Sequence, residues 1–174
     1  MQLGYVICEG RGETDRLLTE LADRLLADGV RLAGVVQTNT ECADNAKCDM
    51  DLRVLPDEAT IRISQSLGAG ARGCRLNPSE LERAVALVGQ SLDADPELLI
   101  INKFGKHEAD GRGFRPLIAE TLSRGIPVLV GLNGLNEEKF QDFAEGMAER
   151  VAGDLDALRA WANSARGKAV PDVA

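Results

Sequence analysis

The sequence predicts a three-layer α/β fold, with a mostly parallel sheet, helices on both of its faces and a β-hairpin insertion. The chain opens with a strand, a glycine loop, a helix and a second strand, an order that favours parallel strands joined by a right-handed crossover. Residues 98–101 form a continuous apolar run, which is typical of a central parallel strand buried on both faces. The 174 residues, 44% of them hydrophobic, suffice for one buried core.

Periodicity and turn residues define the elements of the first half. Residues 3–8 and 32–36 form short apolar strands, and leucines at helical spacing between them predict a helix that stops at Gly29. Apolar residues then alternate with polar ones over 50–63. This alternation indicates a half-buried hairpin or a pair of edge strands.

Capping residues mark the next helix, which begins after Asn77. Asn77 can accept hydrogen bonds from the first turn, Pro78 suits that turn, and Glu80 can complete a capping box. Beyond the central strand, apolar spacing predicts a helix over about 114–125 and a strand at 128–130.

Two acidic helices, around 137–150 and 154–165, are expected to end the fold. We therefore predict a single domain over 1–165 and a flexible tail at 166–174.

Charge and composition exclude several functional classes. There are 28 acidic and 20 basic residues, a net charge of −8, and binding to DNA or RNA depends instead on many Lys and Arg side chains. A local basic pocket for a small anion remains compatible with this charge. No membrane span and no signal peptide are apparent, so we expect a cytoplasmic protein without membrane partners. A homo-oligomer is left open.

The four cysteines predict free thiols. Cys8, Cys42, Cys48 and Cys74 occur in a chain without an export signal, where a disulfide framework is not expected. The spacing does not match a zinc knuckle, so no metal site is assigned. A site that gathers Cys42, Cys48 and Cys74 in space is the alternative.

A glycine loop at 9–14 follows the first strand and opens the first helix. Glycines permit a tight turn, and the free N–H groups at the start of a helix are well placed to bind an anion. A P-loop needs G-x-x-x-x-G-K-[ST], but Glu13 stands at the lysine position, which argues against an ordinary ATPase. The alternative is a plain strand-to-helix turn. The candidate ligand-binding residues here are Gly10, Arg11, Gly12 and Thr14.

The loop at 102–115 holds the densest group of charges and the only histidine, His107. It leaves the central strand at the edge where open α/β sheets bind ligands, and the helix after it is expected to point its N-terminus at the same place. Asn102 occupies the position of a metal-binding strand-end acid. A solvated loop is the alternative. The candidate ligand-binding residues here are Asn102, Lys103, Lys106 and Arg112.

Two further arginines, Arg72 and Arg75, flank Cys74 among glycines. They could line an oxyanion pocket, and the alternative is a polar loop.

Four segments resemble a bacterial family that is classed as a domain of unknown function. They are LAGVVQ at 32–37, ISQ at 63–65, GCRL at 73–76 and, above all, INKFGKHEADGRG at 101–113. Members are often labelled as molybdenum-transport-associated or nucleoside-triphosphatase-like proteins. The element order is also similar to P-loop nucleoside triphosphatases. The resemblance implies a degenerate P-loop fold and a link to molybdate or tungstate metabolism, and it supplies no catalytic residue and no cofactor.

The leading hypothesis is an anion- or nucleotide-binding protein that is not an enzyme. The first alternative is a nucleoside triphosphatase whose metal is held by Glu13, Glu108 or Asp110. The second is a structural or regulatory partner protein whose acidic C-terminal helices dock on another subunit. Trp161, Leu155 and Leu158 could form that face, but packing on the chain's own core is the favoured interpretation.

Overall fold

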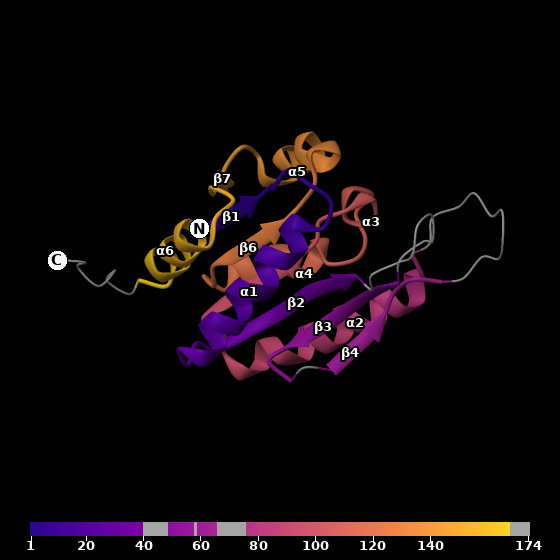
Figure 1. Cartoon of the computed structure of the whole chain (residues 1–174), viewed down its shortest axis with the longest axis horizontal. Helices are drawn as coiled ribbons and strands as arrows, with labels where there is room; N and C mark the ends of the chain where they lie inside the picture. Colours follow the sequence, from indigo (N-terminus) through magenta and orange to yellow (C-terminus); the bar gives the residue numbers. More distant parts are fainter. Residues whose placement is uncertain (40–48, 58, 66–75, 168–174) are drawn as a thin grey trace.

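A computed structural model describes residues 1–39, 49–57, 59–65 and 76–167 (Figure 1). The strands are β1 (Leu3–Val6), β2 (Leu32–Asn39), β3 (Met50–Leu55), β4 (Ala59–Arg62), β5 (Leu98–Asn102), β6 (Val128–Gly131) and β7 (Glu149–Arg150). The helices are α1 (Glu13–Ala27), α2 (Pro78–Ser91), α3 (Lys106–Ala109), α4 (Arg115–Ser123), α5 (Glu137–Ala144) and α6 (Leu155–Ala165).

The described strands form one seven-stranded sheet in the order β4-β3-β2-β5-β6-β1-β7. Pairing is parallel from β2 through β5, β6 and β1 to β7, whereas β3 runs antiparallel to both β2 and β4. This confirms the mostly parallel sheet and the hairpin. The carboxyl ends of β1, β5 and β6 therefore meet at one edge of the sheet.

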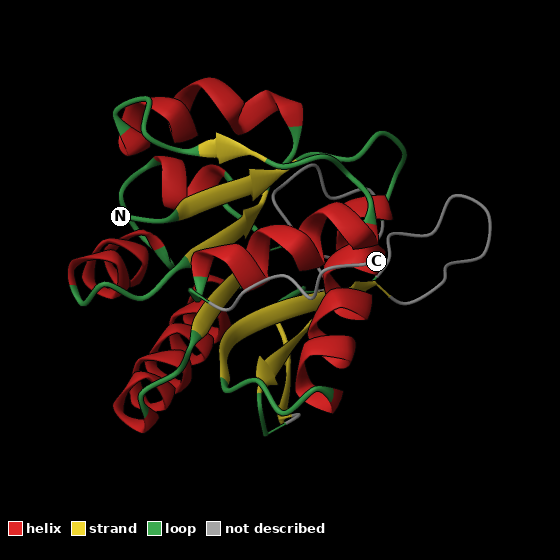
Figure 2. Ribbon diagram, turned by 90° about the vertical axis from the view of Figure 1, so that its left-hand side faces the viewer, coloured by secondary structure: helices red, strands yellow, loops and turns green. Residues whose placement is uncertain are grey.

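Helices cover both faces of the sheet, which confirms the three layers (Figure 2). One buried cluster joins α1 and α6 to the sheet, and the other joins α2, α4 and α5 to the opposite face. The predicted cap of α2 is confirmed, because the Asn77 side chain accepts from the N–H groups of Ser79 and Glu80. No described helix has the combined length and apolarity that a membrane span requires.

The helix expected over 137–150 is too long, which is a correction. It ends at Ala144, where Glu145 and Gly146 take the left-handed conformation with φ of 52° and 71°. The chain then forms β7, which pairs with β1 at Gly4 and Tyr5. A strand of two residues has too little alternation to be predicted from sequence.

The last helix packs on the chain's own core, which confirms the favoured interpretation of Trp161 and Leu158 over the docking face. Trp161 and Leu158 are buried in the chain's own core, and the Trp161 indole N–H donates to Glu149 at 3.1 Å. The indole ring occupies the space beside Gly4, where a Cβ would lie 2.6 Å from it. Of the tail expected from 166, the structure describes Arg166 and Gly167, and Arg166 forms an ion pair with Glu97 at 3.3 Å.

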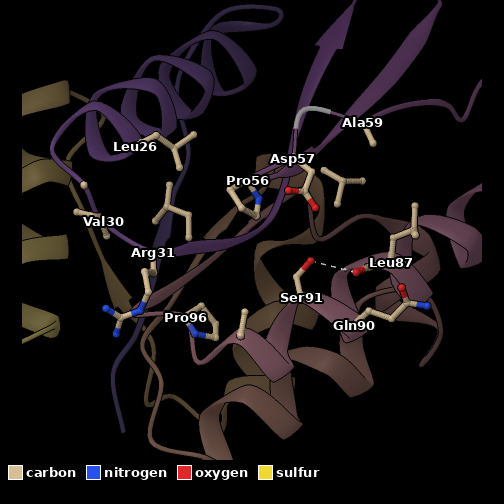
Figure 3. Close-up of a pocket in the computed structure, with 14 residues that line it drawn as sticks. Leu26, Val30, Arg31, Pro56, Asp57, Ala59, Leu87, Gln90, Ser91 and Pro96 are labelled. Atoms are coloured by element: carbon tan, nitrogen blue, oxygen red, sulfur yellow. Dashed lines mark hydrogen bonds between the residues drawn. The ribbon is translucent and has the colours of Figure 1, made fainter.

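The opposite, amino edge of the sheet carries a groove of about 630 Å³ between α1, the β3–β4 turn and α2 (Figure 3). Side chains such as Leu26, Val30 and Leu87 line it. Polar groups there bond within the protein: Ser91 donates to the Leu87 carbonyl, and Arg31 donates to the Asp95 carbonyl.

Candidate functional site

The glycine loop makes the tight turn that its sequence predicts. Gly10 and Gly12 have φ of 97° and 78°, a conformation that side chains with a Cβ rarely adopt. α1 begins at Glu13 with Gly12 as its N-cap, and no side chain caps it. The Thr14 hydroxyl accepts from the Cys8 N–H at 3.0 Å, so its own hydrogen is left to donate to another group. The first turn of α1, a helix of 15 residues, therefore begins just beyond the carboxyl end of β1.

A pocket of about 180 Å³ lies in front of this turn. Its lining includes six of the predicted residues, namely Gly10, Arg11, Gly12, Thr14, Asn102 and Lys103. β1 delivers the glycine loop and β5 delivers the Asn102–Lys103 pair, with β6 between the two strands. The sheet order thus brings together two segments that lie about 90 residues apart in sequence.

Asn102 is the unusual residue of this pocket. It is 0% exposed, and neither Oδ1 nor Nδ2 of its amide has a hydrogen-bond partner among the described residues. Its backbone pairs with Gly131 of β6. A Cβ on Gly131 would lie 3.1 Å from both Asn102 Oδ1 and Thr14 Cγ2, so the missing side chain gives the amide its space.

Lys103 belongs to a polar network that the sequence analysis missed. Its Nζ lies 3.7 Å from Oδ1 of Asp15, whose other oxygen accepts from Asn39 Nδ2 at 2.7 Å. The Oδ1 atom of Asn39 in turn accepts from Nε2 of Gln37 at 2.9 Å. Asp15 is only 6% exposed and also lines the pocket. In the sequence, this network could have been recognised from Gln37 and Asn39, two polar residues that follow the apolar run 32–36.

A second pocket of about 570 Å³ adjoins the first and shares Asn102, Lys103 and Asn133 with it. Lys106 and Arg112 line this second pocket and are absent from the lining of the first. Its other walls include buried Leu52, Ile63, Leu81 and Phe114. The candidate basic residues of the 102–115 loop are therefore divided between two adjacent pockets.

Some predicted residues lie outside the described part of the chain: Arg72, Arg75, Cys42, Cys48 and Cys74. Cys8 is a free thiol. The described residues contain no group of three or more His, Cys, Asp or Glu side chains that could hold a metal ion.

Glu108 stabilises its own loop, and this weakens its role as a metal ligand. It is 3% exposed, and its oxygens accept from the Gly105 N–H at 2.9 Å and the Phe114 N–H at 3.3 Å. Burial raises the pKa of this carboxyl, and the backbone donors offset only part of the effect. The Gly113 N–H donates to Glu82 at 3.1 Å. The N–H groups of Gly113 and Phe114, just before α4, are therefore occupied by the protein's own carboxylates, which argues against the expectation that the N-terminus of α4 serves the anion site.

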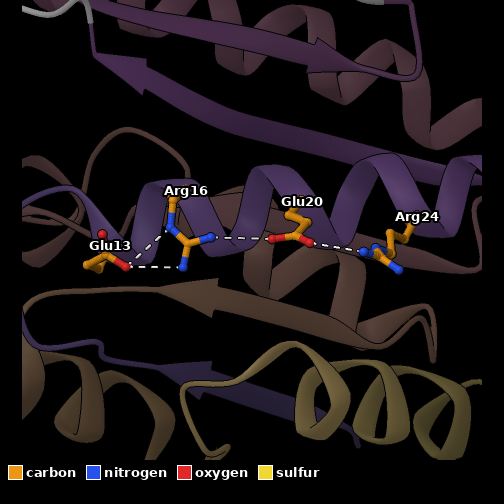
Figure 4. Close-up of polar contacts among 4 residues, drawn as sticks. All are labelled: Glu13, Arg16, Glu20 and Arg24. Atoms are coloured by element: carbon orange, nitrogen blue, oxygen red, sulfur yellow. Dashed lines mark hydrogen bonds and ion pairs between the residues drawn. The ribbon is translucent and has the colours of Figure 1, made fainter.

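Glu13, at the lysine position of a P-loop, is paired within α1. Its Oε2 lies 3.1 Å from Arg16 Nη2, and alternating charges continue through Glu20 to Arg24 (Figure 4). The nearby carboxylate of Glu13 raises the pKa of Arg16. The negative charge at the helix start is thus partly compensated by a cation one turn on.

The fold and the strand-loop-helix at its edge define a P-loop nucleoside-triphosphatase-like scaffold. The solution structure of a human cancer-related nucleoside triphosphatase is similar, with a TM-score of 0.57 and 17% identity over 86% of each chain. The chain belongs to the family described as protein of unknown function DUF2478, whose model matches residues 3–161.

A further relative is the molybdenum import ATP-binding protein ModC 2 of Bradyrhizobium diazoefficiens. It is 31% identical over 160 residues, which cover 92% of this chain. The chain spans only 18% of that relative's length.

Proposed function

We propose that this protein binds a phosphate group or a tetrahedral oxyanion between the Gly10–Thr14 turn and Asn102–Lys103, without hydrolysing nucleotides. The observation that carries the proposal is the fully buried Asn102 amide with two unpartnered atoms beside the start of α1. Buried polar atoms almost always have a hydrogen-bond partner, and an exception beside a pocket supports a bound ligand as the missing partner.

Charge and backbone geometry support an anion as that ligand. The N-terminus of α1 carries partial positive charge and N–H donors. Arg11 and Lys103 line the same pocket, opposed by the single carboxylate of Asp15. Arg11, Lys103 and the start of α1 supply the positive charge that a lysine at position 13 would otherwise provide.

The volume of the pocket supports a small ligand. At ~30 Å³ for each water molecule, 180 Å³ has room for a tetrahedral oxyanion but not for a whole nucleoside triphosphate. The rest of a nucleotide would extend into the adjoining pocket beside Lys106 and Arg112. Ligand pockets for such molecules commonly measure ~300–1,000 Å³, and the 570 Å³ of this pocket fall within that range.

Two departures from the P-loop nucleoside triphosphatase pattern support binding without hydrolysis. Glu13 stands where a lysine would contact the β- and γ-phosphates, and Asn102 stands where an acid would hold Mg²⁺. The name of the ModC 2 relative makes molybdate and tungstate the oxyanions to test beside phosphate, and ATP and GTP the nucleotides.

Thermal-shift measurements with these five ligands test the proposal, followed by calorimetry on each ligand that raises the melting temperature. We expect at least one anion to stabilise the protein, with turnover of ATP and GTP well below ~1 s⁻¹. Lys103→Ala should weaken the binding roughly ten- to a hundredfold, because it removes one charge-assisted contact. Arg31→Ala, at the opposite edge of the sheet, is the matched control and should bind like the parent. Failure of all five ligands to shift the melting temperature would refute the proposal.

A further inference from the structure

We propose that Asn102 selects a tetrahedral oxyanion that still carries a proton, so that the pocket prefers hydrogenphosphate to sulfate, molybdate and tungstate. This inference rests on the proposed function and names its ligand. It follows from the chemistry of the atoms around the pocket.

The Asn102 amide has a hydrogen-bond donor, Nδ2, and a hydrogen-bond acceptor, Oδ1. Both atoms are buried and lack a partner among the described residues. Exchanging the two atoms by flipping the amide leaves the same requirement. A ligand that satisfies both atoms must therefore both accept and donate a hydrogen bond.

Fully deprotonated oxyanions cannot meet this requirement. Sulfate, molybdate and tungstate at neutral pH present acceptors only, so they can bind Nδ2 but place a negative oxygen against Oδ1. Hydrogenphosphate has the same tetrahedral shape, and its P–OH group can donate. Leaving a buried acceptor unpaired, and facing a second acceptor, costs binding free energy.

A second acceptor lies in the lining of the same pocket. One oxygen of Asp15 already accepts from Asn39, while its Oδ1 is 3.7 Å from Lys103 Nζ, beyond ordinary hydrogen-bond length. Asp15 Oδ1 therefore has capacity to accept from a P–OH group. The Thr14 hydroxyl and the first N–H groups of α1 supply the donors. The pocket thus combines donors for anionic oxygens with acceptors for a proton.

Access to the amide requires a small movement, because Asn102 is fully covered. Lys103 is the adjacent residue, and its side chain is 35% exposed and loosely paired with Asp15. An entering anion attracts the Lys103 ammonium away from Asp15. This movement would free Asp15 Oδ1 for the ligand's proton.

Isothermal titration of the whole chain with phosphate and with sulfate, at pH 7.5 and equal ionic strength, tests the inference. The two ions match in size and shape and differ in the proton. Sites that hydrogen-bond a ligand hydroxyl can reject analogues without it by ~10⁴- to 10⁵-fold. With one neutral amide and one shared carboxylate, we expect at least a hundredfold preference for phosphate. Molybdate and tungstate should bind no better than sulfate.

A variant of Asn102 tests whether this residue causes the preference for phosphate over sulfate. Asn102→Ala should weaken phosphate binding much more than sulfate binding, so that the preference falls below tenfold. Asn163→Ala, an asparagine on α6 whose side chain accepts from Arg166, is the matched control and should keep the parental preference.

The outcomes separate the two proposals. Sulfate or molybdate binding within tenfold of phosphate by the parent protein would overturn the inference and leave the proposed function standing. Binding of no anion at all would overturn both. The comparison in the parent protein needs no variant, so a folding defect in Asn102→Ala cannot hide the answer.

Discussion

Two loops leave the same edge of the sheet, and they differ in what their backbone N–H groups bind. In the loop before α4, Glu108 accepts from Gly105 and Phe114, and Glu82 accepts from Gly113. In the loop before α1, a glycine is the N-cap and no side chain caps the helix. Both loops are rich in glycine and charge. Internal carboxylates accept from the N–H groups of the first loop, which we call the closed loop. No side chain caps the helix after the second loop, which we call the open loop.

The largest effect is expected from breaking the closed loop. Glu108→Ala leaves two backbone donors without their acceptor, at ~1–3 kcal/mol for each buried group. We expect a loss of about 2–4 kcal/mol in the free energy of unfolding, or roughly 5–15 °C in melting temperature. Chemical and thermal denaturation measure it. Asp110→Ala, which removes an exposed carboxylate from the same loop, is the control and should change stability little.

The next effect concerns the open loop and has the opposite sign. Asn102→Leu replaces a buried amide without a partner by an apolar side chain of the same branched shape. We expect the unliganded protein to gain ~1–2 kcal/mol in unfolding free energy and to bind phosphate more weakly. Urea denaturation measures the change in unfolding free energy, and calorimetry measures the change in affinity. A destabilised variant would instead assign Asn102 a role in folding.

These expectations show what sequence can and cannot reveal. The strands other than β7, and the Asn77 cap, depend on local spacing, and the structure confirms them. The partner of Lys103 is Asp15, on a helix 88 residues earlier, and the space for the Asn102 amide depends on the missing side chain of Gly131. Such contacts arise from sheet order and not from neighbours in the chain. The short elements α3 and β7 are likewise too brief to show a period.

A smaller effect should appear in the pH dependence of the closed loop. Burial raises the pKa of Glu108 in the folded state, so its contribution to stability is fully present below its unfolded pKa of about 4.3. That contribution is lost as the pH rises through the folded pKa. The unfolding free energy of the parent minus that of Glu108→Gln should therefore be larger at pH 4.5 than at pH 7.5. Urea denaturation at both values checks the sign, and a difference that grows with pH would contradict it.

The smallest effect is expected on the exposed face of α1. Arg16→Ala removes the cation beside Glu13, whose carboxylate then repels an anion at the helix start. We expect anion binding to weaken less than tenfold, and less still at high salt because exposed charges are screened. The melting temperature should hardly move, since exposed ion pairs contribute little. Arg24→Ala, further along the same row of charges, should leave the affinity unchanged.

The burial of Asn102 also sets the order in which evolution could turn this scaffold into a hydrolase. Such a change needs Glu13→Lys and Asn102→Asp. If Asn102→Asp arose first, it would place a second carboxylate in a fully covered position, and that carboxylate would share the Lys103 cation with Asp15. If Glu13→Lys arose first, it would add a cation at an exposed helix start, where the change is tolerable. We therefore expect the exposed substitution to be tolerated before the buried one.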